Sequence, residues 1–306
     1  MRSSPFSVAR RSSPDPTSRR WPTSSGALLV FCWQMRRRNA WQDLLWAGIL
    51  LLATLVSAVT LQTFWTQESP YAGPPPVLLR RWLLTATIGA VLIFLPCAAI
   101  LGAYAVPARE EFEVTQSALL ARLTPFDLCA GRMLAGLWPL VSATLASCAL
   151  WLTAELIWRS AVETGSGYGA ILATHIVLLC ALFMTGSISF LFAQRRRPGR
   201  HWGRGATAGV LWATFCLSAL FLFDGAIRRL SQPRVLIESA LLLNPAAAVA
   251  TALQADLLRT PLLYERSAAP WYRFTYPGPW RTSLLYLGIG MTALVLAAGW
   301  MRRAYR

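Results

Sequence analysis

Lysine is absent from this sequence: all 29 basic residues are arginine. A phosphate-binding loop of the form G-x-x-x-x-G-K-[ST] needs its lysine to reach the phosphates of a nucleotide. The chain therefore contains no such loop and does not hydrolyse ATP by that route. The zinc-protease pattern H-E-x-x-H is absent as well.

Cysteine is present, but it is not arranged for metal or disulfide chemistry. None of the six cysteines forms a C-x-x-C pair, and most of them lie inside apolar stretches. Cysteines in such surroundings behave as small buried hydrophobic residues. We therefore expect neither a metal site nor a disulfide at Cys32, Cys97, Cys129, Cys148, Cys180 and Cys216.

Charge is scarce and mostly of one sign. Charged residues make up 14% of the chain, while 55% of the residues are hydrophobic and the net charge is +16. Soluble domains contain roughly 25% charged residues. The arginines lie at the ends of apolar runs, which is typical of a membrane protein, and are not gathered on one soluble face as in a nucleic-acid-binding domain. The composition predicts a protein that contacts lipid and does not bind nucleic acid.

Six runs without any charged residue follow one another along the chain. Each meets the requirement of about 18 apolar residues for a helix that crosses a bilayer. The fold class expected is an all-α integral membrane protein with six transmembrane helices. The predicted spans are Leu44–Gln67, Trp82–Ala108, Met133–Ala154, Thr164–Gln194, Gly205–Phe223 and Thr282–Met301.

The arginines also predict the orientation of the spans. With the N-terminus in the cytoplasm, 19 of the 29 arginines fall in cytoplasmic segments and 10 fall outside. Of those 10, seven lie in one long loop, where charge has little influence on orientation. Both termini are therefore expected on the cytoplasmic side of the inner membrane.

The long loop before the last span contains a further apolar run, Ser239–Ala255, which is broken at Asn244-Pro245. A central proline interrupts a helix, and 17 residues are marginal for a span. We expect two short helices that meet at Asn244-Pro245 and dip into the outer leaflet as a re-entrant segment. The alternative, a seventh span, would place the C-terminal arginines outside, against the positive-inside rule.

The first 34 residues are rich in arginine, serine and proline, and we expect them to form a disordered cytoplasmic tail. Their apolar patch, Ala27–Trp33, is too short to span a membrane. Residues 35–306 then form the membrane domain. Met35 is a second possible translation start, because it opens a basic flank before the first span.

Charge and helical periodicity combine in the stretch Arg109–Arg132, between the second and third predicted spans. An acidic first turn suits the positive end of a helix dipole, and an apolar face follows it at helical spacing. The acidic residues are Glu110, Glu111 and Glu113, and the face comprises Phe112, Gln116, Leu119, Leu120 and Leu123. A second helix is expected to start at once, with Thr124 as its N-cap, Pro125 in its first position and Asp127 closing a capping box.

The same stretch resembles the cytoplasmic loop of ABC-2-type transporter permeases, the membrane subunits of ATP-driven exporters. That loop typically opens as E-R-E-x-G-T-L-E-L-L-L and continues as L-[ST]-P-x-[DE]-[IL]-x-x-G-[KR]. Here E-E-F-E-V-T-Q-S-A-L-L matches the first half, and L-T-P-F-D-L with Gly131-Arg132 matches the second. The resemblance covers residues 36–306. Val114 stands where the family usually has glycine, and the loop is one residue shorter.

The resemblance implies that this helix is a coupling helix, which docks on a separate ATPase subunit. ATP and magnesium would bind in that partner, a second permease subunit would complete the transport path, and this chain would have no cofactor and no catalytic residue of its own. The coupling residues implied are Glu110, Glu111, Phe112, Glu113, Thr115, Leu119, Leu120, Leu123, Pro125 and Asp127.

Two other classes of function stay open. Ionisable residues within membrane segments are often functional. Glu155 and His175, in or near the third and fourth spans, could serve an intramembrane hydrolase. A membrane scaffold without transport activity is the third possibility. A copurifying ATPase would separate the transporter from the other two.

The predicted topology can be tested with single cysteines at Arg196→Cys, Tyr272→Cys and Arg303→Cys. A membrane-impermeant thiol reagent applied to intact cells should label only position 272, because the arginine distribution places the other two in the cytoplasm. Labelling at 303 but not at 272 would overturn the six-span arrangement.

Overall fold

The structure is a computed structural model, and it describes residues 24–37, 43, 45–56, 59, 75–106, 123–162, 167–194, 202–255, 269, 272 and 274–304. Within these ranges the secondary-structure elements are helices, and no strand occurs. The prediction of an all-α protein is thereby confirmed for the part of the chain that is described.

Five helices are long and apolar enough to cross a membrane. They correspond to the second to sixth predicted spans, and each is continuous over the greater part of its predicted run. The five are α3 (Pro75–Tyr104), α5 (Pro125–Val162), α6 (Tyr168–Gln194), α7 (Trp202–Leu222), which continues into α8 (Asp224–Ile227), and α12 (Pro279–Ala304).

The first predicted span is described only in part. Leu45–Val56 is an apolar helix, and most of the rest of Leu44–Gln67 lies outside the described residues. Exposed apolar side chains cover much of its surface, among them Leu45, Leu52 and Leu55. The described residues therefore contain a helical piece of this run that is too short to cross a membrane by itself.

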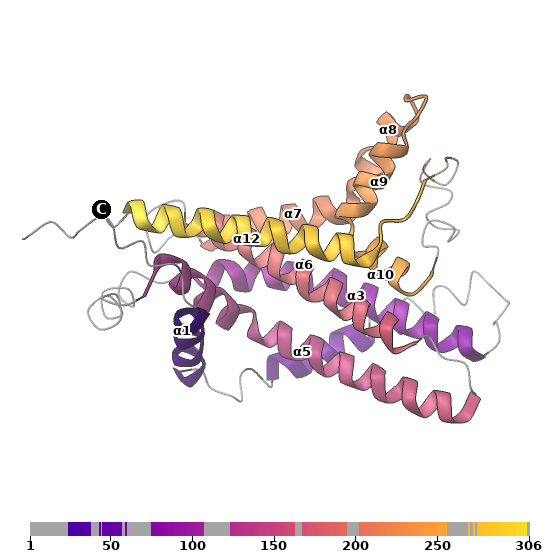
Figure 1. Ribbon diagram of the computed structural model, residues 1–306, viewed down its shortest axis with the longest axis horizontal. Coiled ribbons are helices and arrows are strands. Elements are labelled where there is room, and N and C mark those ends of the chain that lie inside the picture. Colours follow the sequence, from indigo (N-terminus) through magenta and orange to yellow (C-terminus); the bar gives the residue numbers. More distant parts are fainter. Residues whose placement is uncertain are drawn as a thin grey trace, which may run out of the picture.

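The five long helices run alternately up and down, so that their ends gather at two opposite ends of an elongated bundle (Figure 1). We call one the α1 end: it holds α1 (Ser24–Arg37), the last turns of α3, α6 and α12, and the first turns of α5 and α7. We call the other the α10 end. It carries α8, α9 (Arg234–Leu243) and α10 (Pro245–Ala252).

Helix α6 forms the centre of the bundle. It packs against α3, α5, α7, α10 and α12, and 78% of its most apolar stretch lies inside the protein, against 22% for α5. Aliphatic and aromatic side chains from these helices form one core around it. The outward faces of α5, α7 and α12 carry exposed leucines, as expected for surfaces in contact with lipid acyl chains.

Glycines allow α6 to approach its neighbours closely. A Cβ atom added to Gly102 of α3 would collide with the backbone of Gly186 in α6, and one added to Gly209 of α7 would collide with the hydroxyl of Ser189. Small residues have this role in membrane proteins because lipid tails are as apolar as leucine, so that helices associate mainly through close packing.

Several hydroxyl groups inside the bundle are bonded back to their own helices. Thr144 donates to the carbonyl of Leu140 at 2.8 Å, and Ser189 donates to that of Thr185 at 3.0 Å. Further along, Thr251 donates to Ala247 at 2.8 Å. A hydroxyl without a partner in an apolar medium costs free energy, and the carbonyl four residues earlier is the nearest acceptor.

Glycine packing can be tested with Gly102→Val, and Gly288→Val in α12 is the matched control. A valine at position 102 has no room against Gly186, whereas a Cβ atom added at position 288 meets no atom within 4 Å. Overpacking of this kind costs roughly 1–3 kcal/mol. The detergent-solubilised Gly102→Val protein should melt several degrees below the Gly288→Val protein. Equal melting temperatures would contradict the close α3–α6 packing.

Candidate functional site

The residues assigned to ATPase coupling fall into two groups in the structure. Residues 107–122 lie outside the described residues, and with them Glu110, Glu111, Phe112, Glu113, Thr115, Leu119 and Leu120. Their roles stay predictions. Leu123, Pro125 and Asp127 are described, and they lie where the chain enters α5 at the α1 end of the bundle.

Thr124 and Asp127 form the predicted capping box at the start of α5. Asp127 N–H donates to Thr124 Oγ1 at 3.1 Å, and Thr124 N–H donates to Asp127 Oδ2 at 3.2 Å. The Thr124 hydroxyl also donates to Oδ2 at 2.7 Å. These bonds satisfy backbone donors that a helix start leaves free, and Pro125 in the first helical position has no N–H to satisfy. As a result α5 begins eight residues before the predicted third span.

Helix α1 packs directly on this capping box. A methyl group at Gly26 would lie 2.6 Å from Asp127 Oδ2, and one at Gly131 would lie 2.6 Å from the carbonyl oxygen of Ala27. The carboxylate of Asp127, which is buried, therefore faces the first turn of α1, where a helix dipole favours negative charge.

The position of α1 corrects one expectation from the sequence. Residues 1–34 were expected to form a disordered tail, but Ser24–Gln34 belongs to a helix that continues to Arg37, across the expected domain boundary. Local composition argued against structure here, whereas the contact with α5 buries Val30 and supplies the stabilisation that a short isolated helix lacks. Residues 1–23 lie outside the described residues.

Polar contacts between α5 and α6 recur from one end of the bundle to the other. Near the α1 end, Gln194 Nε2 donates to Cys129 Sγ at 3.6 Å, and Ser187 Oγ donates to Met133 Sδ at 3.0 Å. At the α10 end, Glu155 Oε1 accepts from the backbone N–H of Gly167 at 2.9 Å. These contacts fix the register of α5 against α6.

His175 adds a further contact between the same two helices. Its Nδ1 lies 2.8 Å from the carbonyl oxygen of Ile171, and its Nε2 lies 3.4 Å from Ser147 Oγ. A carbonyl oxygen only accepts, so Nδ1 carries the proton and Nε2 accepts from the serine. Ser147 and Glu155 are eight residues apart on α5, which is roughly 12 Å along the helix. The contacts of His175 and Glu155 thus occur at different depths, and each has a local structural explanation.

Asn244 organises the break between α9 and α10, which meet at an angle of 90°. Its Oδ1 accepts from the N–H groups of Ala246 at 2.9 Å and Ala247 at 3.3 Å, so that it caps the first turn of α10. Its Nδ2 donates to the carbonyl of Leu217 in α7 at 3.0 Å. Pro245 suits the first position of α10 because it has no N–H.

Tyr286 of α12 completes this cluster. The N–H of Ala247 bonds to the Asn244 side chain, so it does not reach the carbonyl of Leu243 in the manner of a continuous helix. The Tyr286 hydroxyl donates to that carbonyl at 2.9 Å, and its ring is fully buried. Hydrogen bonds therefore connect the junction between α9 and α10 to both α7 and α12. That the bent pair is re-entrant from the outer side stays a prediction.

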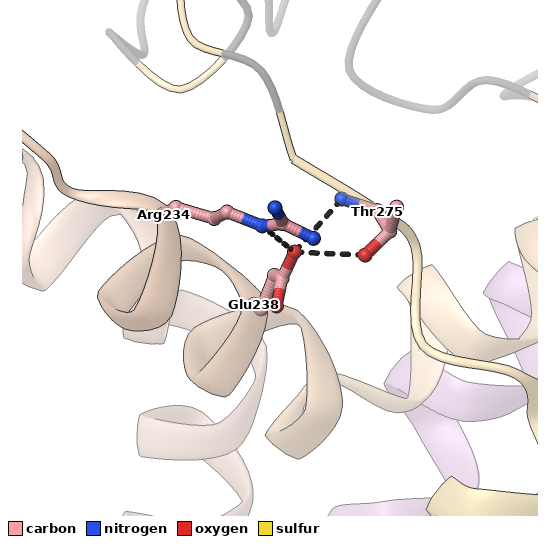
Figure 2. A network of polar contacts seen from close by, with 3 residues as sticks. All are labelled: Arg234, Glu238 and Thr275. Carbon is pink, nitrogen blue, oxygen red and sulfur yellow. Dashed lines mark hydrogen bonds and ion pairs between the residues drawn. The ribbon is translucent and has the colours of Figure 1, made fainter.

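A second polar network holds α9 to the segment that leads into α12 (Figure 2). Glu238 Oε1 accepts from Arg234 Nε at 2.8 Å, from the Thr275 hydroxyl at 2.8 Å and from the Thr275 backbone N–H at 3.1 Å. The guanidinium of Arg234, followed by the two donors of Thr275, lowers the pKa of Glu238 to about 2. The carboxylate of Glu238 is therefore charged at neutral pH.

In the described part of the chain, no group of three or more histidine, cysteine, aspartate or glutamate side chains is placed to hold an ion, and the six cysteines are free thiols.

Several members of these sites were not identified from the sequence, Tyr286 and Gly26 among them. Tyr286 could have been noticed, because a tyrosine inside a charge-free run needs a partner for its hydroxyl. The role of Gly26 has no such signal, since it depends on where α1 packs.

Comparison with known proteins identifies no relative: no family model, curated protein or solved structure matches this chain.

Tyr286→Phe tests the cluster around the break with the loss of a single oxygen. The carbonyl of Leu243 would lose its donor in a buried site, which costs roughly 1–3 kcal/mol. Tyr272→Phe is the control, because its ring packs against a core cluster around α9 while its hydroxyl takes no part in the hydrogen bonds of the break. The melting temperature in detergent should fall for Tyr286→Phe and stay close to the parent value for Tyr272→Phe. If both variants melt like the parent, the hydroxyl does not stabilise the break.

Proposed function

We propose that the chain is the membrane permease subunit of an ATP-driven ABC-2-type exporter. It would pair with a second permease subunit and with separate ATPase subunits, which bind ATP and magnesium. The observation that carries the proposal is the capping box of Thr124 and Asp127. It lies within L-T-P-F-D-L, a described part of the loop motif, and it starts a membrane-length helix directly after the acidic amphipathic stretch of the sequence.

The geometry suggests how such a subunit would transmit motion. A displacement of the stretch before Leu123 would reach α5 through its first turn, which the capping box holds rigid. Helix α5 is 38 residues long, or roughly 57 Å, so it extends from this turn to the opposite end of the bundle. Its contacts with α6 would carry the same motion into the centre of the bundle.

The arrangement of helix ends supports the proposed topology. In the proposal the α1 end faces the cytoplasm, together with both termini and the ATPase, and the α10 end faces outward in the inner membrane. The two exposed arginines of the last described turns, Arg302 and Arg303, belong to the α1 end. Helix α10 has eight residues and reaches about 12 Å, well short of the roughly 30 Å of a hydrocarbon core, which favours a re-entrant segment.

Phe112→Ala tests the proposed docking of the amphipathic helix. Burial of one large apolar side chain stabilises a contact by roughly 1.5–3 kcal/mol, whereas an exposed charge pair contributes about 0–1 kcal/mol. Phe112→Ala should therefore reduce copurification of the ATPase at least tenfold, and more than Glu111→Gln does. Transport and stimulated ATP hydrolysis should fall together.

Leu284→Ala serves as the matched control, because it removes an exposed apolar side chain from α12, far from the proposed docking site. It should leave the complex intact. A double variant, Phe112→Ala with Leu120→Ala, that retains both the complex and transport would refute the coupling role. Absence of any copurifying ATPase with the parent chain would refute the transporter itself.

A further inference from the structure

We propose that the α10 end of the bundle binds anionic phospholipid headgroups through a belt of exposed arginines. The belt consists of Arg228 and Arg229 at the end of α8, Arg234 at the start of α9, and Arg281 in the first turn of α12. This inference requires only that the long helices cross a membrane, and it is independent of the proposed transport function.

Helix length places these arginines at the level of the headgroups. The apolar helix Gly203–Ile227 has 25 residues, or roughly 37 Å, and so exceeds a hydrocarbon core of about 30 Å. Exposed Arg204 marks its other end, so Arg228 and Arg229 lie just beyond the core on the opposite side. In α12, Arg281 and Arg302 are 21 residues apart, or roughly 32 Å, and therefore lie in opposite headgroup layers.

The guanidinium groups of the belt are available to a ligand. The side chains of Arg228 and Arg234 are 60% and 61% exposed, although each makes an ion pair, with Asp224 and Glu238 respectively. Arg229 and Arg281 are also exposed, and neither makes an ion pair with another described residue. Guanidinium groups bind phosphate oxygens in pairs, and an anionic lipid surface attracts each of them.

Apolar side chains beside the belt favour a lipid surface over a partner protein. Leu222 is 62% exposed, Leu230 48%, Val235 76% and Trp280 61%. In the sequence, each of these four lies within six residues of an arginine of the belt, and the segments that carry them meet at the α10 end of the bundle (Figure 1). The boundary between headgroups and acyl chains is typically lined by exposed tryptophan, aliphatic side chains and arginine together.

The experiment compares two lipids at one reporter. A bimane fluorophore is attached at Ser231→Cys, between α8 and α9, in a Cys32→Ser background, and the protein is placed in nanodiscs. Nitroxide-labelled phosphatidylglycerol or nitroxide-labelled phosphatidylcholine is added at equal mole fraction. One arginine at an anionic surface is expected to change lipid affinity roughly fivefold. Phosphatidylglycerol should therefore show at least a threefold higher apparent affinity in the quenching curve.

Charge variants assign the preference to the belt. The triple variant Arg228→Gln, Arg229→Gln, Arg281→Gln should bind the two lipids equally, and lysine at the same three positions should restore the preference. The matched triple at the other end, Arg204→Gln, Arg302→Gln, Arg303→Gln, should leave it unchanged. The proposal is overturned if the parent shows no preference, if neither lipid quenches the reporter, or if the first triple retains the preference.

Discussion

Every backbone N–H and C=O group within a hydrocarbon layer needs a partner inside the protein, because no water is present to replace it. Continuous helices meet this requirement by themselves, and the break between α9 and α10 does not. The side chain of Asn244 takes the place of the missing acceptors in the first turn of α10, and the hydroxyl of Tyr286 takes the place of the donor that Leu243 has lost. The break is tolerated because Asn244 itself and Tyr286 of α12 supply these partners, while the Leu217 carbonyl of α7 accepts from Asn244 Nδ2 and holds that side chain in place.

Close packing around α6 follows from the same environment. Lipid tails exert no hydrophobic force that would drive two apolar helices together, so contacts depend on fit and on a few polar bonds. Gly102 and Gly186 let the backbones of α3 and α6 meet, while His175 and Ser187 bond across to α5. These contacts fix the position of each neighbouring helix along α6. A uniformly apolar surface would let the helices slide past one another.

The capping box at the start of α5 is a local motif that also makes a tertiary contact. Thr124, Pro125 and Asp127 would begin a helix in any soluble protein. In this chain Asp127 also faces the first turn of α1, and the helix that it begins extends through the bundle. The capping box therefore fixes the first turn of a helix that extends through the bundle.

Patterns that depend on neighbours in the chain were readable from the sequence. Five membrane-length helices, the start of α5 directly after Thr124 and the capping box follow from composition, spacing and capping chemistry within a few residues. The break at Asn244-Pro245 follows from the central proline as well, whereas the helix at Ser24–Arg37, the bond from Tyr286 to Leu243 and the 90° angle at that break do not follow from local patterns. Each of these features depends on residues brought together from distant parts of the chain: α1 is stabilised by α5, and the bend by α7 and α12. Local periodicity carries no information about such partners, so only the tertiary structure decided them.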